Sequence, residues 1–150
     1  MTGRPEPAGL LMHDAWRADI VLAHRIEIAG GRYAPGRVRN EVGELLADRL
    51  EALALLDVNV LVSELVTNAV RHGGTDAQET ITIHVAVAPH VLRIEVCDQG
   101  PGFTPPDIPL PREEGGGNGL VLLSRMSSSW GVACDDGTCV WFERMLAPKP

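Results

Sequence analysis

The sequence has few cysteines, no excess of basic residues and no long apolar run. Its three cysteines, Cys97, Cys134 and Cys139, are an odd number and a poor basis for a disulfide framework. We therefore expect them to be reduced, although Cys134 and Cys139 flank Asp135–Thr138 and could face each other across a hairpin. Two cysteines without a second pair of ligands do not make a zinc site.

The charge balance excludes several classes of partner. Thirteen Lys and Arg against twenty Asp and Glu give a formal net charge of −7. A chain without a basic field cannot displace counterions from phosphates, so the sequence argues against direct nucleic-acid or membrane binding. No apolar run approaches the roughly 20 residues that span a membrane, and Met1–Asp14 lacks the cationic and apolar regions of a signal peptide. We expect a cytoplasmic protein.

Apolar periodicity predicts one strand, two helices, two strands, a loop, one helix and two strands, in that order. Partial alternation predicts the first strand, and apolar residues three and four apart predict the two helices that follow. The second helix is expected to begin at an N-cap, Asp57, and to end before Gly73 and Gly74. The expected elements are Ile20–Ala29, Pro35–Ala54, Asp57–His72, Thr80–Val87, Val91–Cys97, Gly119–Ser128, Trp130–Cys134 and Thr138–Arg144.

The strict alternation in the predicted hairpins indicates strands with one buried face. Helices packed on one face of an antiparallel or mixed sheet would bury each apolar surface once. We therefore expect an α+β fold, a two-layer α/β sandwich with a mixed, mostly antiparallel sheet. Residues 15–146 are expected to form a single domain, with a flexible N-terminal tail at 1–14 and a short tail at 147–150.

One candidate site lies on the second predicted helix. Glu64, Asn68 and His72 recur every four residues and so stack on one side of it. A carboxylate and a carboxamide one turn apart can orient a nucleophile and hold a hydrated divalent cation. The alternative is a solvated polar face opposite the core, and His72 alone is more simply a histidine packing at a helix end.

Two glycine-containing segments are the other candidates. Asp98, directly after a predicted strand, opens an Asp-x-Gly-x-Gly segment with Gly100 and Gly102. An ionised aspartate only accepts hydrogen bonds, so it can select a ligand with an exocyclic amine, such as adenine. Gly115–Leu120 opens the last helix, where free backbone N–H groups favour an anion such as a triphosphate. The alternatives are an ordinary turn and a flexible hinge, respectively.

Together these segments resemble the motifs of the GHKL ATPase superfamily, whose members share the Bergerat ATP-binding fold. Glu64–His72 is similar to the N box, Asp98–Gly102 to the first glycine box and Gly117–Leu120 to the second. The resemblance covers about Pro35 to Arg144.

Within that superfamily the chain resembles the small actinobacterial anti-sigma factor serine/threonine kinases. The segments that carry this resemblance are Ser63–His72, Trp130–Val132 and Val140–Glu143. Ser127 and Ser128 depart from the pattern, since relatives often have Ala-Asp there, which puts the surroundings of that helix end in doubt.

The resemblance implies ATP and Mg²⁺ as cofactors and a role for each motif. Asn68 would be the metal ligand, Glu64 the catalytic general base on an incoming serine hydroxyl, and Asp98 the acceptor for the adenine amine. The other cofactor-binding residues, which would shape the pocket and its lid, are Gly100, Gly102, Gly117, Asn118, Gly119 and Leu120. Phosphoryl transfer needs mainly positioning and charge neutralisation, so this small set is sufficient.

The resemblance also implies protein partners. The acceptor would be a serine or threonine on an anti-anti-sigma protein of the STAS type, and the kinase would hold a sigma factor. Relatives commonly dimerise, so a homodimer is one arrangement among those left open. The alternatives are an ATP-binding partner-switch module without catalysis and a detached histidine-kinase catalytic domain. Glu64 favours the enzyme, because binding alone needs no base beside Asn68.

Overall fold

The computed structural model of the chain describes residues 18–72, 79–100, 119–134 and 137–146. The predicted order of elements is confirmed, and most boundaries agree within two residues. The elements are β1 (Leu22–Ala29), α2 (Ala34–Leu46), α3 (Ala52–His72), β2 (Thr80–Ala88), β3 (Val91–Asp98), α4 (Gly119–Met126), β4 (Ser129–Ala133) and β5 (Thr138–Met145).

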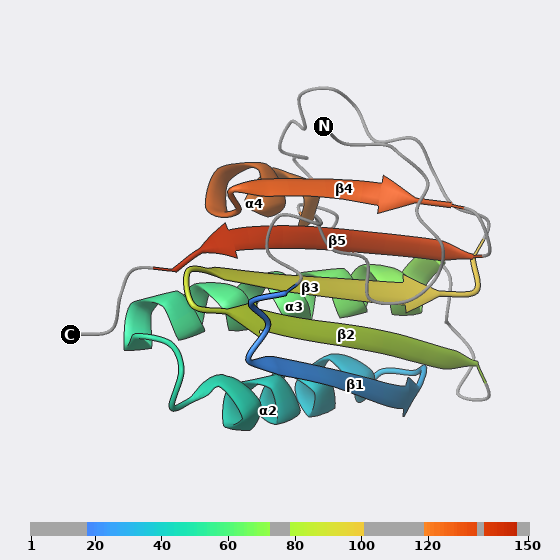
Figure 1. Cartoon of the computed structure of the whole chain (residues 1–150). Helices are drawn as coiled ribbons and strands as arrows, with labels where there is room; N and C mark the ends of the chain where they lie inside the picture. The colour runs from blue at the N-terminus through green and yellow to red at the C-terminus, as the bar shows by residue number, and fades with distance from the viewer. Residues whose placement is uncertain (1–17, 73–78, 101–118, 135–136, 147–150) are drawn as a thin grey trace.

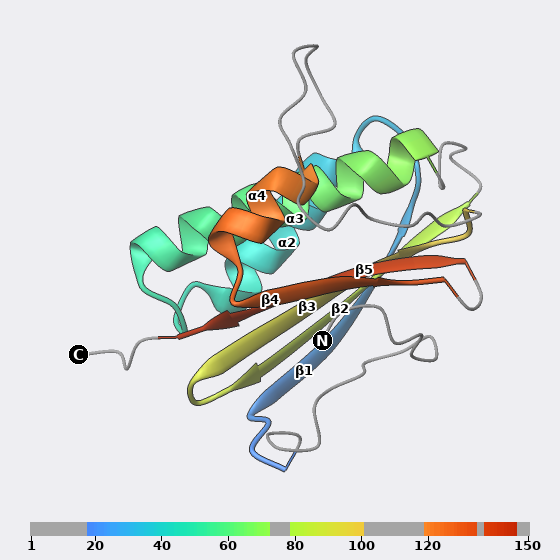
Figure 2. The same ribbon diagram turned by 90° about the horizontal axis from the view of Figure 1, so that it is seen from above.

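The strands form one five-stranded sheet in the order β1-β2-β3-β5-β4, and every neighbouring pair is antiparallel. The three described helices pack on one face of this sheet, and among the described residues no helix covers the other face (Figures 1 and 2). The expected two-layer α+β sandwich is therefore confirmed. The sheet is antiparallel throughout rather than mixed, because the β4–β5 hairpin inserts β5 between β4 and β3.

The junction between the first two helices differs from the prediction. Helix α2 ends at Leu46 and α3 begins at Ala52, so neither the continuation of the first helix to Ala54 nor an N-cap at Asp57 is correct. The apolar spacing misled the prediction because Leu50 is buried from the connecting segment rather than from a helix. Asp57 instead lies within α3, where its Oδ2 is 2.8 Å from Arg144 Nη1 on the last strand.

Helix α3 is the central element of the helical layer. Its fully buried side chains pack against the sheet in the main core cluster: Val58, Leu61, Val62 and Val66. Contrary to the expectation from sequence, residues 52–71 are long and apolar enough to cross a membrane by length and composition, with a mean hydropathy of 1.6. Core packing accounts for part of that apolarity, since 33% of this stretch is buried. The apolar side chains of Leu53, Leu56 and Val60 are exposed.

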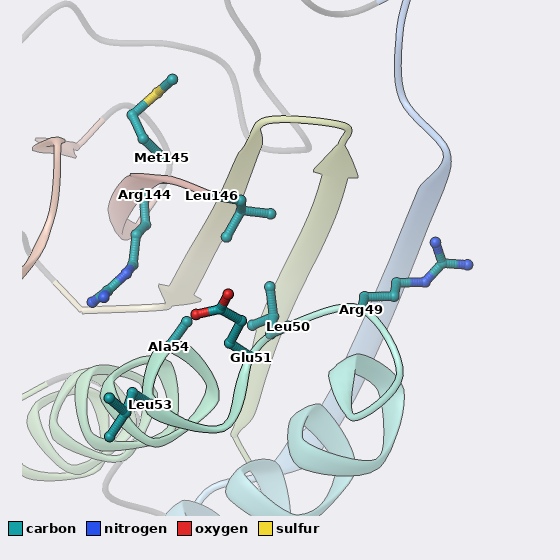
Figure 3. A pocket seen from close by; sticks show the side chains of 8 residues that line it. All are labelled: Arg49, Leu50, Glu51, Leu53, Ala54, Arg144, Met145 and Leu146. Atoms are coloured by element: carbon teal, nitrogen blue, oxygen red, sulfur yellow. The ribbon is translucent and has the colours of Figure 1, made fainter. Parts of the chain in front are cut away.

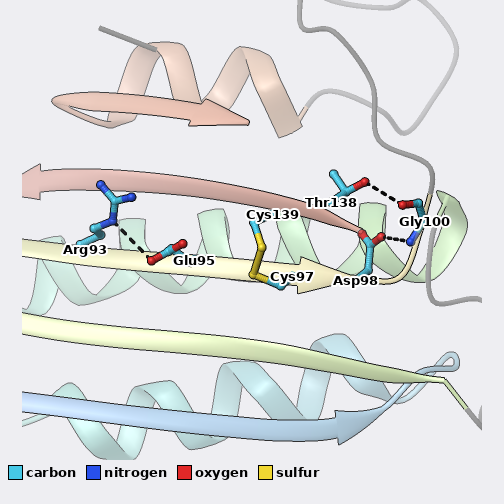
Figure 4. Close-up of a disulfide and its surroundings, with 7 residues drawn as sticks. All are labelled: Arg93, Glu95, Cys97, Asp98, Gly100, Thr138 and Cys139. Atoms are coloured by element: carbon cyan, nitrogen blue, oxygen red, sulfur yellow. Dashed lines mark hydrogen bonds and ion pairs between the residues drawn. A yellow bond between two sulfur atoms is a disulfide. The ribbon is translucent and has the colours of Figure 1, made fainter. Parts of the chain in front are cut away.

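The helix-free face of the sheet carries buried charges. Arg93 on β3 is only 2% exposed; its Nη1 lies 3.2 Å from Glu143 Oε2, and its Nε lies 3.6 Å from Glu95 Oε2. The guanidinium carbon is 4.1 Å from the ring centroid of Trp141, a cation–π stack. The prediction that these strands bury a single face is therefore wrong, because ion pairs and stacking replace water at Arg93 and Glu95 (Figure 4).

Gly131 on β4 lies against the Trp141 ring of this stack. A methyl group at Gly131 would lie 2.7–2.9 Å from three atoms of the Trp141 indole, so the ring would have to shift away from its place beside Arg93. We expect Gly131→Ala to lower the free energy of unfolding by about 1–3 kcal/mol, as overpacking does. Urea denaturation measures this effect. Gly43→Ala is the matched control, because its methyl group has 3.6 Å to the nearest atom; equal stability of the two variants would contradict the prediction.

His84 lies on the same face, opposite Arg25 of β1 and Glu95 of β3 in the strand register. Burial lowers the pKa of His84, the Arg25 guanidinium acts in the same direction, and Glu27 opposes both. The native imidazole therefore holds its proton less tightly than the unfolded one. The His84 side chain therefore has no effect on the free energy of unfolding well above pH 6.5. As the pH falls below that value, it lowers the free energy of unfolding progressively.

The structure corrects the prediction for the cysteines. Cys97 on β3 and Cys139 on β5 are opposite each other in the register and form a disulfide (Figure 4). Cys134 is exposed and is not part of the bridge. The residue opposite Cys139 on β4 is Ala133, the last residue of that strand, so Cys134 has no place in the ladder opposite Cys139.

Candidate functional site

The polar side of α3 and the start of α4 meet at one point. A methyl group placed on Gly119, the first residue of α4, would lie 2.6 Å from Asn68 Nδ2 and 3.5 Å from Glu64 Cβ. Only a residue without a side chain allows this approach. Two of the three predicted motif segments are therefore in direct contact, and the pair Glu64 and Asn68 faces a helix N-terminus rather than open solvent.

The first turn of α4 supplies backbone donors at this contact. The leading N–H groups of any helix lack intrahelical acceptors and carry the positive end of the helix dipole. Gly119 is buried, and the Leu120 side chain packs against the main core cluster, which anchors the helix. The Leu120 side chain therefore has a structural role, and only the backbone of Leu120 can take the predicted role of binding an anion.

Asp98 ends β3 and organises the turn that follows it. The Gly100 N–H donates a hydrogen bond to Asp98 Oδ1 at 2.7 Å, as in an Asx turn. The Thr138 hydroxyl, buried at the start of β5, donates to the Gly100 carbonyl oxygen at 3.3 Å (Figure 4). Because Thr138 is the register partner of Asp98, the turn is held from both strands.

A glycine in the β4–β5 connection is required beside this turn. Gly137 has a φ of 87°, and a methyl group there would lie 2.2 Å from the Asp98 carbonyl oxygen. Neither Thr138 nor Gly137 was among the predicted site residues. Their proximity to Asp98 depends on the pairing of β3 with β5, which no local pattern signals.

The Asp98 turn lies toward the same side of the molecule as the C-terminal half of α3, which carries Glu64 and Asn68. Strand β3 and helix α3 run in the same direction, so the C-terminal end of β3 and the C-terminal half of α3 are neighbours (Figures 1 and 4). The predicted site residues Gly102, Gly117 and Asn118 lie outside the described residues, as does the side chain of His72. The described part of the site is thus Glu64, Asn68, Asp98, Gly100 and the start of α4.

The donor set suits a magnesium ion held mainly by other oxygens. Among the described residues there is no group of three or more His, Cys, Asp or Glu side chains that could hold a metal. Mg²⁺ is commonly bound by one or two protein oxygens together with water and substrate phosphates. Asn68, beside Glu64 and a helix N-terminus, fits that mode of binding better than a site built from protein ligands alone.

A cavity of about 170 Å³ lies at the opposite end of α3 (Figure 3). It is lined by Arg49, Leu50, Glu51, Leu53, Ala54, Arg144, Met145 and Leu146. It shares no residue with the predicted site, and it is smaller than the roughly 300–1,000 Å³ typical of ligand pockets. The candidate site therefore remains the α3–α4 contact and the Asp98 turn.

A comparison with known sequence families finds a match over most of the chain. The sequence family described as the histidine kinase-like ATPase domain matches residues 33–144, which include all the predicted site residues. No curated protein matches the chain significantly.

Two solved structures share the fold. The RsbU and RsbW domains of Rv1364c from Mycobacterium tuberculosis align with a TM-score of 0.64 and 22% identity, covering 85% of this chain and 34% of that one. The histidine kinase domain of the blue-light activated histidine kinase from Erythrobacter litoralis EL346 aligns with a TM-score of 0.50 and 22% identity, covering 75% of this chain and 59% of that one. The chain thus spans about a third of the first structure and less than two thirds of the second.

Proposed function

Because the chain belongs to the histidine kinase-like ATPase family, we propose that it is an ATP-dependent protein serine/threonine kinase that controls a sigma factor. Its substrate is an anti-anti-sigma protein of the STAS type. Whether this substrate protein is unphosphorylated decides whether the kinase holds the sigma factor. We place this activity in the cytoplasm, in the single domain formed by residues 15–146. The observation that supports the site is the contact of Gly119 with Asn68 and Glu64.

Each described residue has a defined task in this proposal. Bound Mg-ATP supplies the phosphoryl group. The Glu64 carboxylate would accept the proton of the serine or threonine hydroxyl as that oxygen forms a bond to the γ-phosphorus, while the bond from that phosphorus to ADP breaks and ADP leaves. The Asn68 amide oxygen contributes one ligand to the magnesium ion, and the first N–H groups of α4 stabilise phosphate charge. Asp98 accepts a hydrogen bond from the adenine amino group and holds the Gly100 turn in place.

The direct test is phosphoryl transfer from labelled Mg-ATP to purified STAS-type acceptor proteins. The proposal predicts an acid-stable phosphoserine or phosphothreonine on the acceptor. Tight ATP binding without transfer to any acceptor would support a partner-switch module instead. An acid-labile product would identify a histidine acceptor and a detached histidine-kinase catalytic domain.

Asp98→Asn separates the two uses of the Asp98 carboxylate. Asparagine keeps one acceptor oxygen for the Gly100 N–H but replaces the other oxygen with a donor. We expect weaker ATP binding and a loss of preference for ATP over GTP of about tenfold or more, since a mispaired buried donor is costly. Isothermal titration with both nucleotides measures this preference. Unchanged selectivity would remove Asp98 from the adenine site.

Asn68→Ala tests the metal ligand. We expect the variant to bind ATP with an affinity that no longer rises when magnesium is added, because the protein oxygen that couples the metal to the site is gone. Titrations with and without MgCl₂ measure the effect. Asn40→Ala, on the exposed surface of α2, is the matched control and should keep the magnesium dependence. If Asn68→Ala responds to magnesium as strongly as the control, the metal is held elsewhere.

A further inference from the structure

The disulfide adjoins both residues that hold the Asp98 turn. Cys97 directly precedes Asp98, and Cys139 directly follows Thr138. In the β3–β5 ladder, Cys97↔Cys139 and Asp98↔Thr138 are successive pairs, and the second is the last pair at that end. The covalent link is therefore one register position from the turn that we assign to adenine (Figure 4).

We propose that Cys97 and Cys139 form a thiol–disulfide switch that controls how tightly the chain binds its nucleotide. The proposal rests on the proposed function, because it acts through the Asp98 turn. Terminal pairs of a strand ladder open more readily than central ones. When oxidised, the bridge stops β3 and β5 from separating and preorganises two hydrogen bonds, the one that the Gly100 N–H donates to Asp98 and the one that the Thr138 hydroxyl donates to the Gly100 carbonyl oxygen. When the bridge is reduced, only non-covalent contacts hold the turn, these two hydrogen bonds among them.

The surroundings of the bridge suit a reversible switch. The helix layer covers Val96 and Val140, whereas Cys97 and Cys139 alternate with them and lie on the helix-free face. Cys97 is partly exposed, and Cys139 is 6% exposed. Cys97 is thus the more accessible residue of the pair, and we take its sulfur as the point of attack. In a reducing cytoplasm, disulfides are usually transient and serve catalysis or redox sensing rather than scaffolding.

The chemistry is ordinary thiol–disulfide exchange with a dithiol as the co-reactant. A dithiol thiolate attacks Cys97 Sγ, the Cys97–Cys139 bond breaks, and Cys139 leaves as a thiolate that takes up a proton. The second thiol of the reagent then displaces Cys97, so two electrons pass to the protein and the reagent leaves as a cyclic disulfide. A small-molecule disulfide such as oxidised glutathione reverses the reaction and takes the two electrons back.

The experiment measures ATP affinity of the full chain after treatment with dithiothreitol or with oxidised glutathione. Mass spectrometry after alkylation verifies the state of each cysteine. We expect the reduced protein to bind about tenfold more weakly than the oxidised one, as a site loses preorganisation. Cys134→Ser is the matched control and should keep this difference, because Cys134 lies outside the bridge. The double variant Cys97→Ser, Cys139→Ser should bind like the reduced protein under both conditions.

A second measurement separates failure of the switch from failure of the proposed function. Hydrogen exchange of the Gly100 amide, which donates to Asp98, needs no nucleotide and should be faster in the reduced protein. Equal ATP affinity in both states overturns the switch while leaving the kinase proposal intact. If neither state binds ATP, the proposed function fails, and hydrogen exchange of the Gly100 amide then tests the link between the bridge and the turn. Faster exchange in the reduced protein supports that link. Unchanged exchange overturns it.

Discussion

Replacing Glu64 with glutamine is expected to lower the rate of phosphoryl transfer by about 10²–10⁴-fold, the usual contribution of a general base. The substitution keeps the size and shape of the side chain on α3 but removes its ability to accept a proton. Because the Glu64 atom nearest the Gly119 methyl position is its Cβ, which glutamine keeps, the α3–α4 packing should survive. ATP affinity should therefore remain at the wild-type level while the acceptor is no longer phosphorylated.

The measurement is single-turnover transfer from labelled ATP to the acceptor, with nucleotide affinity determined in parallel. Glu44→Gln, on the exposed side of α2, makes the same charge change away from the site and serves as the control. Wild-type transfer by Glu64→Gln would show that another group takes the proton. Loss of both affinity and transfer would instead assign Glu64 to nucleotide or metal binding.

The second large effect is expected from Gly119→Ala. The new methyl group would lie 2.6 Å from Asn68 Nδ2, so either Asn68 must leave its position or α4 must move away from α3. Displacements of about 1 Å at a reacting site can cost about 10²-fold in rate. We therefore expect a loss of that order in transfer together with weaker Mg-ATP binding. Affinity and transfer assays on the same preparation measure both effects.

A helical glycine elsewhere provides the control for Gly119→Ala. At Gly36 in α2 a methyl group has 3.8 Å to its nearest neighbour, the end of the Arg39 side chain. Gly36→Ala should leave nucleotide binding unchanged and gain up to about 1 kcal/mol of stability from helix propensity. If Gly119→Ala behaves like Gly36→Ala, the contact between α3 and α4 has no part in the site.

The strands were predictable because each carries a pattern with a period of two. In β2 the alternation of Ile81, Ile83 and Val85 with polar residues marks the face that packs on the helices. The same pattern suggested water on the other face of β3, where Arg93 and Glu95 are in fact buried. Arg93 stacks on Trp141 and pairs with Glu143, and both of these residues lie on a strand far along the chain.

The helix boundaries show a second limit of periodicity. Leu50 and Leu53 continue the apolar spacing of α2, yet Leu50 is buried from a connecting segment and Leu53 on α3 is 76% exposed. Spacing alone cannot tell a helix that continues from one that stops and restarts. Asp57 has the chemistry of an N-cap, but its partner is Arg144, which only the tertiary fold brings near.

The candidate site was predictable to the extent that its geometry is local. Four-residue spacing on one helix places Glu64 and Asn68 on the same side, and Gly119 follows from a glycine-rich helix start. Thr138 and the Cys97–Cys139 bridge were missed because both depend on the strand order. The bridge joins residues 42 apart in the chain, and nothing in the sequence between them specifies that β5 lies beside β3.

The positions of the start of β1 and the end of β5 have a practical consequence for the design of fusion proteins. Leu22 at the start of β1 pairs with Val87, and Met145 at the end of β5 pairs with Val91, whereas Asp98 pairs with Thr138 at the far end of the same ladder. The start of β1 and the end of β5 therefore both lie at the end of the sheet remote from Asp98. We therefore expect a reporter or sensory module joined directly before Leu22 or after Met145 to attach at the end of the sheet away from Asp98.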